Sequence, residues 1–152
     1  VKFLAVKIGA FKNKALDEPV DFMIYMIIAA LGFAALENIL VLTTIHPILT
    51  PAKALETMAW RFISATFLHA LCSAVFGYFL ILYFYTNKRK KYMLILGIGI
   101  STGLHALYNF SIMQIEGVGK LLLPAIILIA LGIFVSYTFK KVKRLKSICV
   151  IK

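Results

Sequence analysis

Four long apolar runs dominate the chain. They cover residues 21–42, 57–85, 92–113 and 121–139, and polar or proline-containing stretches separate them. A helix that spans a bilayer needs about 20 mostly apolar residues, because each residue adds 1.5 Å of rise across a hydrocarbon core about 30 Å thick. Each run is therefore long enough to cross a membrane. The pattern predicts an all-α protein, a multi-pass transmembrane helical bundle.

Residues 1–11 form a shorter apolar stretch, which Lys2 and Lys7 interrupt. It is too short to span a bilayer, and we interpret it as the inner end of a truncated helix. Residues 1–152 are then expected to form a single membrane domain with four full spans, this truncated N-terminal helix and a basic tail over residues 140–152.

Composition and charge support the bilayer as the solvent of this chain. Of the 152 residues, 62% are hydrophobic and 15% are charged, against roughly 25% charged in soluble domains. The formal charge of +11 is concentrated in short clusters between the runs, a pattern that predicts lipid rather than nucleic acid as the partner.

The positions of these clusters predict the orientation of the protein. The basic block 88–91 and the tail 140–152 lie on one side of the predicted spans, whereas Lys53 and Lys120 are the loop cations on the other side. The positive-inside rule then predicts a protein of the cell membrane with a cytoplasmic C-terminus. The connectors 43–56 and 114–120 are expected to face away from the cytoplasm.

Polar residues inside the runs require an explanation. Glu37, His69, His105 and Asn109 lie within three different predicted spans, where an ionisable group costs at least ~2.5 kcal/mol. Counting along the helices places them at about 22, 24, 20 and 26 Å above the cytoplasmic face. A single His or Asn in a span often only forms a hydrogen bond between helices, worth about 0.6 kcal/mol. Unrelated residues with that role have little reason to share one depth. We therefore predict one polar site.

Spacing within the second span orients part of this site. Residues Arg61, Ala65, His69, Ser73 and Gly77 follow one another at intervals of four and share a helix face. The small members of this stripe favour close approach of a neighbouring helix. Arg61 lies near the predicted outer interface, where snorkelling is inexpensive, so we expect a topological rather than a chemical role for it.

A carboxylate, two imidazoles and an amide are suited to amide hydrolysis. The carboxylate or a His can take a proton from water, and a second His with the Asn can donate hydrogen bonds to an oxyanion. Glu37, His69 and His105 are also the three ligand types of a catalytic zinc, although the His-Glu-x-x-His motif is absent. The residues alone leave both chemistries open.

Segments 17–25, 32–38 and 105–110, together with Arg61 and His69 between them, resemble the PrsW family of intramembrane proteases. The most specific elements are Gly-Phe-x-x-x-Glu-Asn over 32–38 and His-x-x-x-Asn from His105. The resemblance implies relatedness to the superfamily of the CAAX prenyl endopeptidases. Lys2 resembles the Lys of the family's Glu-Glu-x-x-Lys motif, whose Glu pair would precede Val1.

The same resemblance implies the site residues and their roles. Glu37 matches the second acidic motif, His69 the water-activating His, and His105 with Asn109 the oxyanion donors. It favours a glutamate-type protease with no cofactor, and zinc held by Glu37, His69 and His105 is the alternative. Cleavage of anti-sigma factors in regulated proteolysis is implied by the resemblance alone.

The interpretation is an intramembrane endopeptidase that uses activated water on transmembrane peptide or protein substrates. The competing class is a transporter, channel subunit or binding protein, because intramembrane Glu, His and Asn also form proton relays and substrate sites. The sequence shows no inverted repeat, and the spans 21–42, 57–85 and 92–113 contain no Pro that would break them. Both features disfavour the transporter.

Overall fold

The structure is a computed structural model, and it describes residues 1–10, 16–45, 50–85 and 90–145. Within these ranges every regular element is a helix. Two of them are short π-helical segments that continue or precede an α-helix. The elements are α1 (Lys2–Gly9), α2 (Pro19–Leu40), η1 (Val41–Ile45), α3 (Pro51–Arg61), η2 (Phe62–Thr66), α4 (Phe67–Tyr85), α5 (Lys90–Gln114) and α6 (Gly119–Val142).

Four helical segments are long and apolar enough to cross a membrane. They are Pro19–Thr43, Pro51–Tyr85, Lys91–Gln114 and Gly119–Val142, and each contains one of the four runs predicted to span. Together with α1 they confirm the predicted all-α, multi-pass bundle. The predicted helix at the N-terminus is present over Lys2–Gly9, and Phe11 lies outside the described residues.

The second of these segments differs from the prediction, because the helix begins at Pro51 within the expected connector 43–56. Thr50 caps this helix by accepting a hydrogen bond from the Lys53 backbone N–H at 3.4 Å. Pro51 occupies the first helical position, where its missing N–H costs nothing. A segment of 35 residues is about 52 Å long, so it extends well beyond a hydrocarbon core of about 30 Å.

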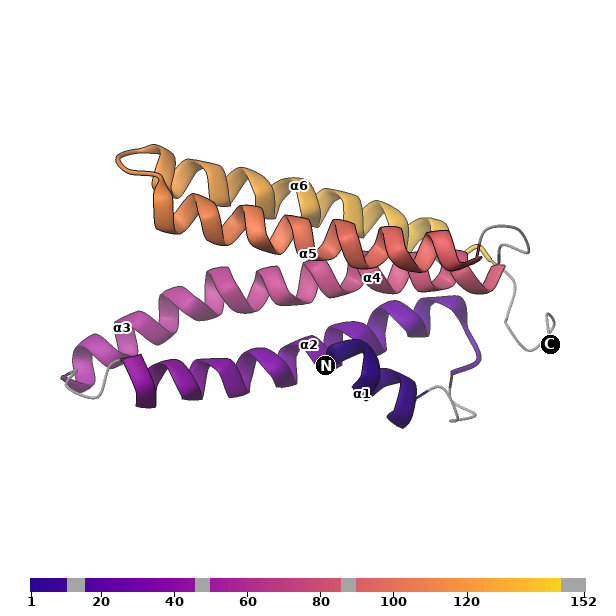
Figure 1. The fold of residues 1–152 in the computed structure, drawn as a ribbon, viewed down its shortest axis with the longest axis horizontal. Helices are drawn as coiled ribbons and strands as arrows, with labels where there is room; N and C mark the ends of the chain where they lie inside the picture. The colour runs from indigo at the N-terminus through magenta and orange to yellow at the C-terminus, as the bar shows by residue number, and fades with distance from the viewer. Residues whose placement is uncertain (11–15, 46–49, 86–89, 146–152) are drawn as a thin grey trace.

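Helix α4 lies between the other spans. Figure 1 shows α2 along one side of it and α5 with α6 along the other. Eleven of its residues are buried, more than in any other helix described. A Cβ atom on Gly77 would lie 2.7 Å from Cα of Met23 and 2.9 Å from the carbonyl oxygen of Phe22, so α2 and α4 pack backbone to backbone there. Gly77 of the small-residue stripe thus allows the close approach of a neighbouring helix that the sequence predicted, and that helix is α2.

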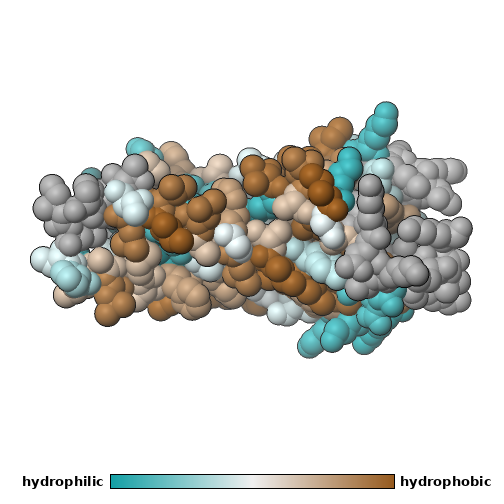
Figure 2. Space-filling model, turned by 90° about the horizontal axis from the view of Figure 1, so that it is seen from below, coloured by the Kyte–Doolittle hydropathy of each residue, from teal (hydrophilic) through white to brown (hydrophobic). Residues whose placement is uncertain are grey.

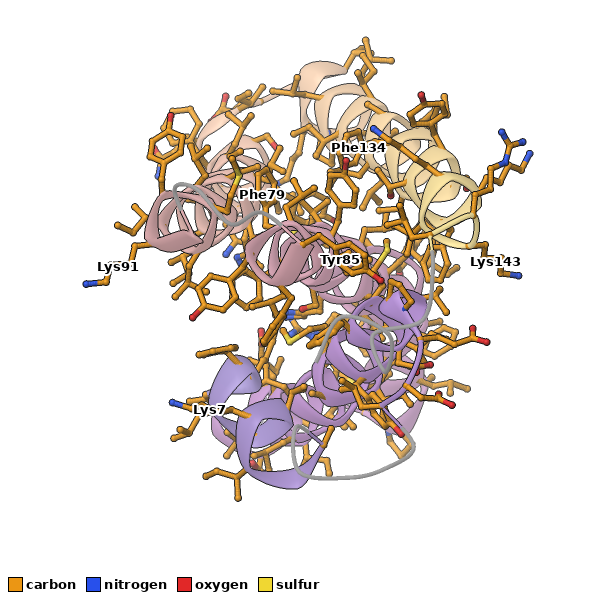
Figure 3. The ribbon with its side chains drawn as sticks, turned by 90° about the vertical axis from the view of Figure 1, so that its right-hand side faces the viewer. Lys7, Phe79, Tyr85, Lys91, Phe134 and Lys143 are labelled. Atoms are coloured by element: carbon orange, nitrogen blue, oxygen red, sulfur yellow. The ribbon has the colours of Figure 1, made fainter. Side chains whose placement is uncertain are left out.

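The exterior of the bundle is apolar along its length and polar at one end. Figure 2 shows brown, hydrophobic side chains over the middle of one face and teal, hydrophilic ones towards the right-hand end. Figure 3 looks onto that end, where Lys7, Lys91 and Lys143 point outwards. All three are exposed, and the assignment of this end to the cytoplasm stays a prediction. Residues 88–89 and 146–152 of the basic clusters lie outside the described ranges.

Helix α1 packs alongside α2 and starts partway along the bundle. In Figure 1 the N-terminus lies near the middle of the long axis, beside α2. Phe3 of α1 contacts Phe76 of α4 edge to face, with ring centroids 5.5 Å apart. The first turn of α1 therefore lies against α4, and this packing brings Lys2 close to the polar residues inside the bundle.

Candidate active site

Glu37 of α2 and His69 of α4 are in direct contact. The Nε2 atom of His69 lies 2.9 Å from Oε2 of Glu37. The His69 side chain is 4% exposed, whereas the Glu37 side chain is 37% exposed and faces open space. The close packing of α2 on α4 therefore holds a buried imidazole against a partly exposed carboxylate.

Lys2 engages the other ring nitrogen of His69. Its Nζ lies 2.7 Å from Nδ1 of His69 and 4.9 Å from the ring centroid of Phe33, which contacts the His69 ring edge to face. An ammonium can only donate a hydrogen bond, so Nδ1 accepts it. The proton of a neutral His69 is then on Nε2, which donates to Glu37. Both ring nitrogens of His69 are thus occupied.

His105 and Asn109 of α5 complete the set of predicted site residues. The rings of His69 and His105 are 4.8 Å apart between centroids. Nδ2 of Asn109 lies 3.4 Å from Nδ1 of His105, a long contact between residues one helical turn apart. His105 is half-buried and Asn109 is exposed. The structure therefore brings Glu37, His69, His105 and Asn109 into one group from three helices.

Arg61 corrects one expectation drawn from the sequence. Its Nη2 lies 3.2 Å from Oε1 of Glu37, and its Nε donates to Oδ1 of Asn38 at 2.8 Å. Asn38 in turn donates through Nδ2 to Oγ1 of Thr66 at 3.2 Å. Arg61 is therefore turned into the bundle. Snorkelling near an interface is inexpensive and would leave the guanidinium outside the bundle, but the Glu37 carboxylate lies within reach and pairs with it instead.

The π-helical segment η2 (Phe62–Thr66) lies between Arg61 and α4. A π turn is wider than an α turn, and such segments are frequent at functional sites. Thr66, the acceptor for Asn38, is its last residue. The segment therefore joins the helix that carries Arg61 to the helix that carries His69.

Two cavities meet at these side chains. The first, called here the Lys2 cavity, measures about 490 Å³, and the second, called the Arg61 cavity, about 540 Å³. Their common lining residues are Glu37, His69 and His105. The Lys2 cavity is otherwise mostly apolar, with Phe33 and Phe76 in its wall. The Arg61 cavity also has the charged residues Lys53 and Glu56 of α3 in its wall.

The sequence pattern did not single out several polar residues that lie in this region. The sequence gives Lys2 no part in the site beyond its match to a family motif, and Asn38 appears only as part of a motif. Two more polar atoms, Tyr108 Oη and Ser101 Oγ, are buried without a hydrogen-bond partner in the part of the chain that is described. Ser101 and Tyr108 line the Lys2 and Arg61 cavities respectively. Ser101 lies one helical turn before His105 on the same face, and this spacing was the sequence feature that pointed to it.

Fold and site together define a class: a multi-pass helical membrane protein whose spans enclose a Glu-His-His-Asn cluster between two cavities. A comparison with family models matches residues 1–138 to the PrsW family, described as intramembrane metalloproteases. The chain belongs to the PrsW family of intramembrane proteases. This confirms the resemblance seen in the motifs.

Two curated relatives are each named Protease PrsW. The protein of Geobacillus kaustophilus (strain HTA426) is 29% identical over 116 residues, which cover 76% of this chain and 48% of that protein. The protein of Shouchella clausii (strain KSM-K16) is 30% identical over 110 residues, which cover 72% and 47%. The chain thus spans about half the length of these relatives. No solved structure matches it.

The family description includes a metal, and the side chains described do not fit one as they are arranged. Across residues 1–10, 16–45, 50–85 and 90–145, no three His, Cys, Asp or Glu side chains are grouped to hold a metal ion. Both ring nitrogens of His69 already contact Glu37 and Lys2. A zinc ligand needs a free, neutral ring nitrogen. Zinc bound by Glu37, His69 and His105 would therefore require Lys2 or Glu37 to move, and metal dependence stays a prediction.

Proposed function

We propose that the intact protein is an intramembrane endopeptidase that hydrolyses peptide bonds of membrane-embedded or membrane-proximal segments with activated water. Membership of the PrsW family supports protease chemistry. The single observation that carries the assignment to this site is the contact of 2.9 Å between His69 and Glu37, at the boundary of two cavities. This contact supports a site at which a carboxylate and an oriented imidazole meet water and peptide.

In this mechanism Glu37 is the general base. Its two oxygens each accept one bond, from Arg61 and from His69, and a carboxylate has lone pairs for about four. A water molecule can therefore bind the exposed side of the carboxylate and transfer a proton to it. His69 orients Glu37, since the Nδ1 of His69 accepts from Lys2 and is not free to accept from water. General-base catalysis by a positioned side chain typically raises the reaction rate by about 10²–10⁴-fold.

His105 and Asn109 stabilise the oxyanion. When Nδ1 of His105 accepts from Asn109, the proton of a neutral His105 is on Nε2 and is available to the substrate oxygen. Water adds to the carbonyl carbon, and its proton passes to Glu37. The C–N bond then breaks, the proton moves from Glu37 to the leaving nitrogen, and an acid and an amine are released.

The Arg61 cavity is the proposed route for water. Lys53 and Glu56 in its wall are exposed, with side chains 58% and 54% accessible, and they form an ion pair at 2.8 Å. Their exposed side chains indicate that this cavity opens to the outside of the bundle. The apolar Lys2 cavity on the other side of Glu37 suits apolar substrate side chains. A substrate peptide segment that passes from lipid into water therefore fits the two cavities best.

The proposed setting is the cell membrane, with the exposed lysine end in the cytoplasm. Lipid surrounds the apolar exterior, and the substrate is a transmembrane peptide or protein. Cleavage of an anti-sigma factor in regulated proteolysis is the finer proposal, and it is supported by the family resemblance alone.

Cleavage of a fluorogenic transmembrane peptide by the intact protein in liposomes tests this function. Glu37→Gln should lower turnover by about 10³-fold, because the amide cannot take the proton. Glu56→Gln is the matched control, since Glu56 lines the Arg61 cavity without contacting His69. Full activity of Glu37→Gln would refute the mechanism. Wild-type protein that cleaves no peptide but transports a solute would favour the transporter class instead.

A further inference from the structure

We infer that Arg61 is a positioning residue for the proposed reaction, which holds the Glu37 carboxylate in place and aims it at His69 and water. This inference rests on the proposed function and goes beyond the four residues to which that function assigns chemistry. Arg61 lines the proposed water route but contacts no substrate and transfers no proton in this scheme, and its effect on the reaction passes through Glu37.

The geometry of the guanidinium supports this role. Arg61 uses two of its nitrogens on two adjacent residues of α2, Nη2 on Glu37 at 3.2 Å and Nε on Asn38 at 2.8 Å. A planar guanidinium with donors at both sites has little freedom to rotate. Because Oε1 of Glu37 faces Arg61, Oε2 is the oxygen left for His69. The orientation of the carboxylate is therefore fixed from both sides.

The support of Arg61 itself comes from Asn38 and Thr66. Asn38 accepts from Arg61 through its carbonyl oxygen and donates from its amide nitrogen to Thr66, so both ends of the amide are used. Thr66 is 8% exposed. The chain of contacts from Thr66 through Asn38 to Arg61 ties the guanidinium to the packed interior rather than to the interface.

The charge of Arg61 matters as well as its shape. A carboxylate inside a membrane protein is costly unless it is paired and hydrogen-bonded. Among the described residues, Arg61 is the cation that contacts Glu37 directly, and Lys2 reaches it only through His69. The Arg61 side chain is 25% exposed, less than half the value for Lys53 in the ion pair on the surface of α3. Screening by solvent is accordingly weaker at Arg61.

The test compares Arg61→Ala with Lys53→Ala in the intact protein in liposomes. Both changes remove one cation from α3 and from the wall of the same cavity, but Lys53 pairs with Glu56 and not with Glu37. Arg61→Ala should lower kcat by about 10²-fold and change KM less than about twofold, since a misplaced base slows chemistry and leaves binding intact. Lys53→Ala should retain kcat within about twofold.

Rescue separates positioning from a merely structural role. The Arg61 cavity borders the vacated site, so added methylguanidinium should restore at least a tenth of the lost kcat to Arg61→Ala. It should restore nothing to Glu37→Gln. Arg61→Lys should be intermediate, because one ammonium cannot contact both Glu37 and Asn38 in the same way. If Arg61→Ala does not fold, Arg61→Lys and Asn38→Ala give the same comparison, each with an expected kcat loss of about tenfold.

Two results would overturn the inference. Wild-type kcat in Arg61→Ala, with Glu37→Gln inactive, would show that Glu37 needs no guanidinium. A kcat loss in Arg61→Ala that follows a lower melting temperature and does not respond to methylguanidinium would assign Arg61 a structural role. Activity in Glu37→Gln would instead refute the proposed function itself, so the two failures are distinguishable.

Discussion

Nε2 of His69 lies 2.9 Å from Oε2 of Glu37, while its Nδ1 lies 2.7 Å from Nζ of Lys2. This relationship bears on which of two groups is the proposed base. Sequence reasoning allowed either the carboxylate or the imidazole to take a proton from water, and the family resemblance assigned that role to His69. With both nitrogens of His69 engaged, the arrangement favours Glu37 as the base and His69 as the group that orients it.

The first prediction concerns His69. If His69 only orients Glu37, His69→Gln should retain at least about tenfold more activity than His69→Ala, because the Gln amide can donate in place of Nε2–H. Single-turnover cleavage of a transmembrane peptide measures this. Equal inactivity of both variants, with normal folding, would return the role of base to His69.

The second prediction concerns His105 and Asn109. Loss of one oxyanion donor costs about 10²–10³-fold in turnover, so His105→Ala and Asn109→Ala should each lower kcat by about 10²-fold or more while substrate still binds. If Asn109 only forms an interhelical hydrogen bond, Asn109→Ala should cost about 0.6 kcal/mol of stability and leave turnover intact. Turnover and thermal stability followed in parallel distinguish the two, and silent variants at both positions would remove the oxyanion site.

The third prediction concerns zinc. A metal-free site predicts that the purified intact protein holds less than stoichiometric zinc and keeps its activity after treatment with a chelator. Elemental analysis and peptide cleavage measure both. One tightly bound zinc per protein, lost in His105→Ala and needed for activity, would require Lys2 or Glu37 to move away from His69 and would replace the proposed mechanism.

The fourth prediction concerns orientation. Single cysteines introduced at Lys53 and Lys120 should react with a membrane-impermeant reagent added to intact cells, and one at Lys91 should be protected. The three positions are exposed, so accessibility of the side chain does not bias the comparison. Labelling at Lys91 with protection at the other two would invert the orientation and place the C-terminus outside.

The fold class followed from the sequence because crossing a bilayer imposes one strong rule. Backbone groups in lipid must be satisfied within a helix, so the length of each apolar run nearly determines its structure. The run that predicted a span over residues 21–42 lies in the segment Pro19–Thr43. The start of α3 was missed although Thr50 and Pro51 carried a helix-start signal, because these residues were interpreted as connector punctuation.

The sequence could predict the depth of the polar site in the membrane but not the contacts between its residues. Rise per residue places Glu37, His69 and His105 at one depth, since 1.5 Å per residue holds in any α-helix. It gives no rotation of one helix about its axis relative to another. Tertiary packing, with Gly77 of α4 against the backbone of α2, sets that rotation and brings His69 within 2.9 Å of Glu37.

The sequence by itself determined that this chain contains four runs long and apolar enough to cross a membrane, which residues inside them are polar, and which family its motifs resemble. Only the tertiary structure decided the direction of Arg61 and Lys2. A long cationic side chain near a membrane interface can extend outwards or pair inwards, and the choice depends on whether a neighbouring helix presents an acceptor within reach. Glu37 and His69 are those acceptors, and their positions depend on packing between segments that are distant in the sequence.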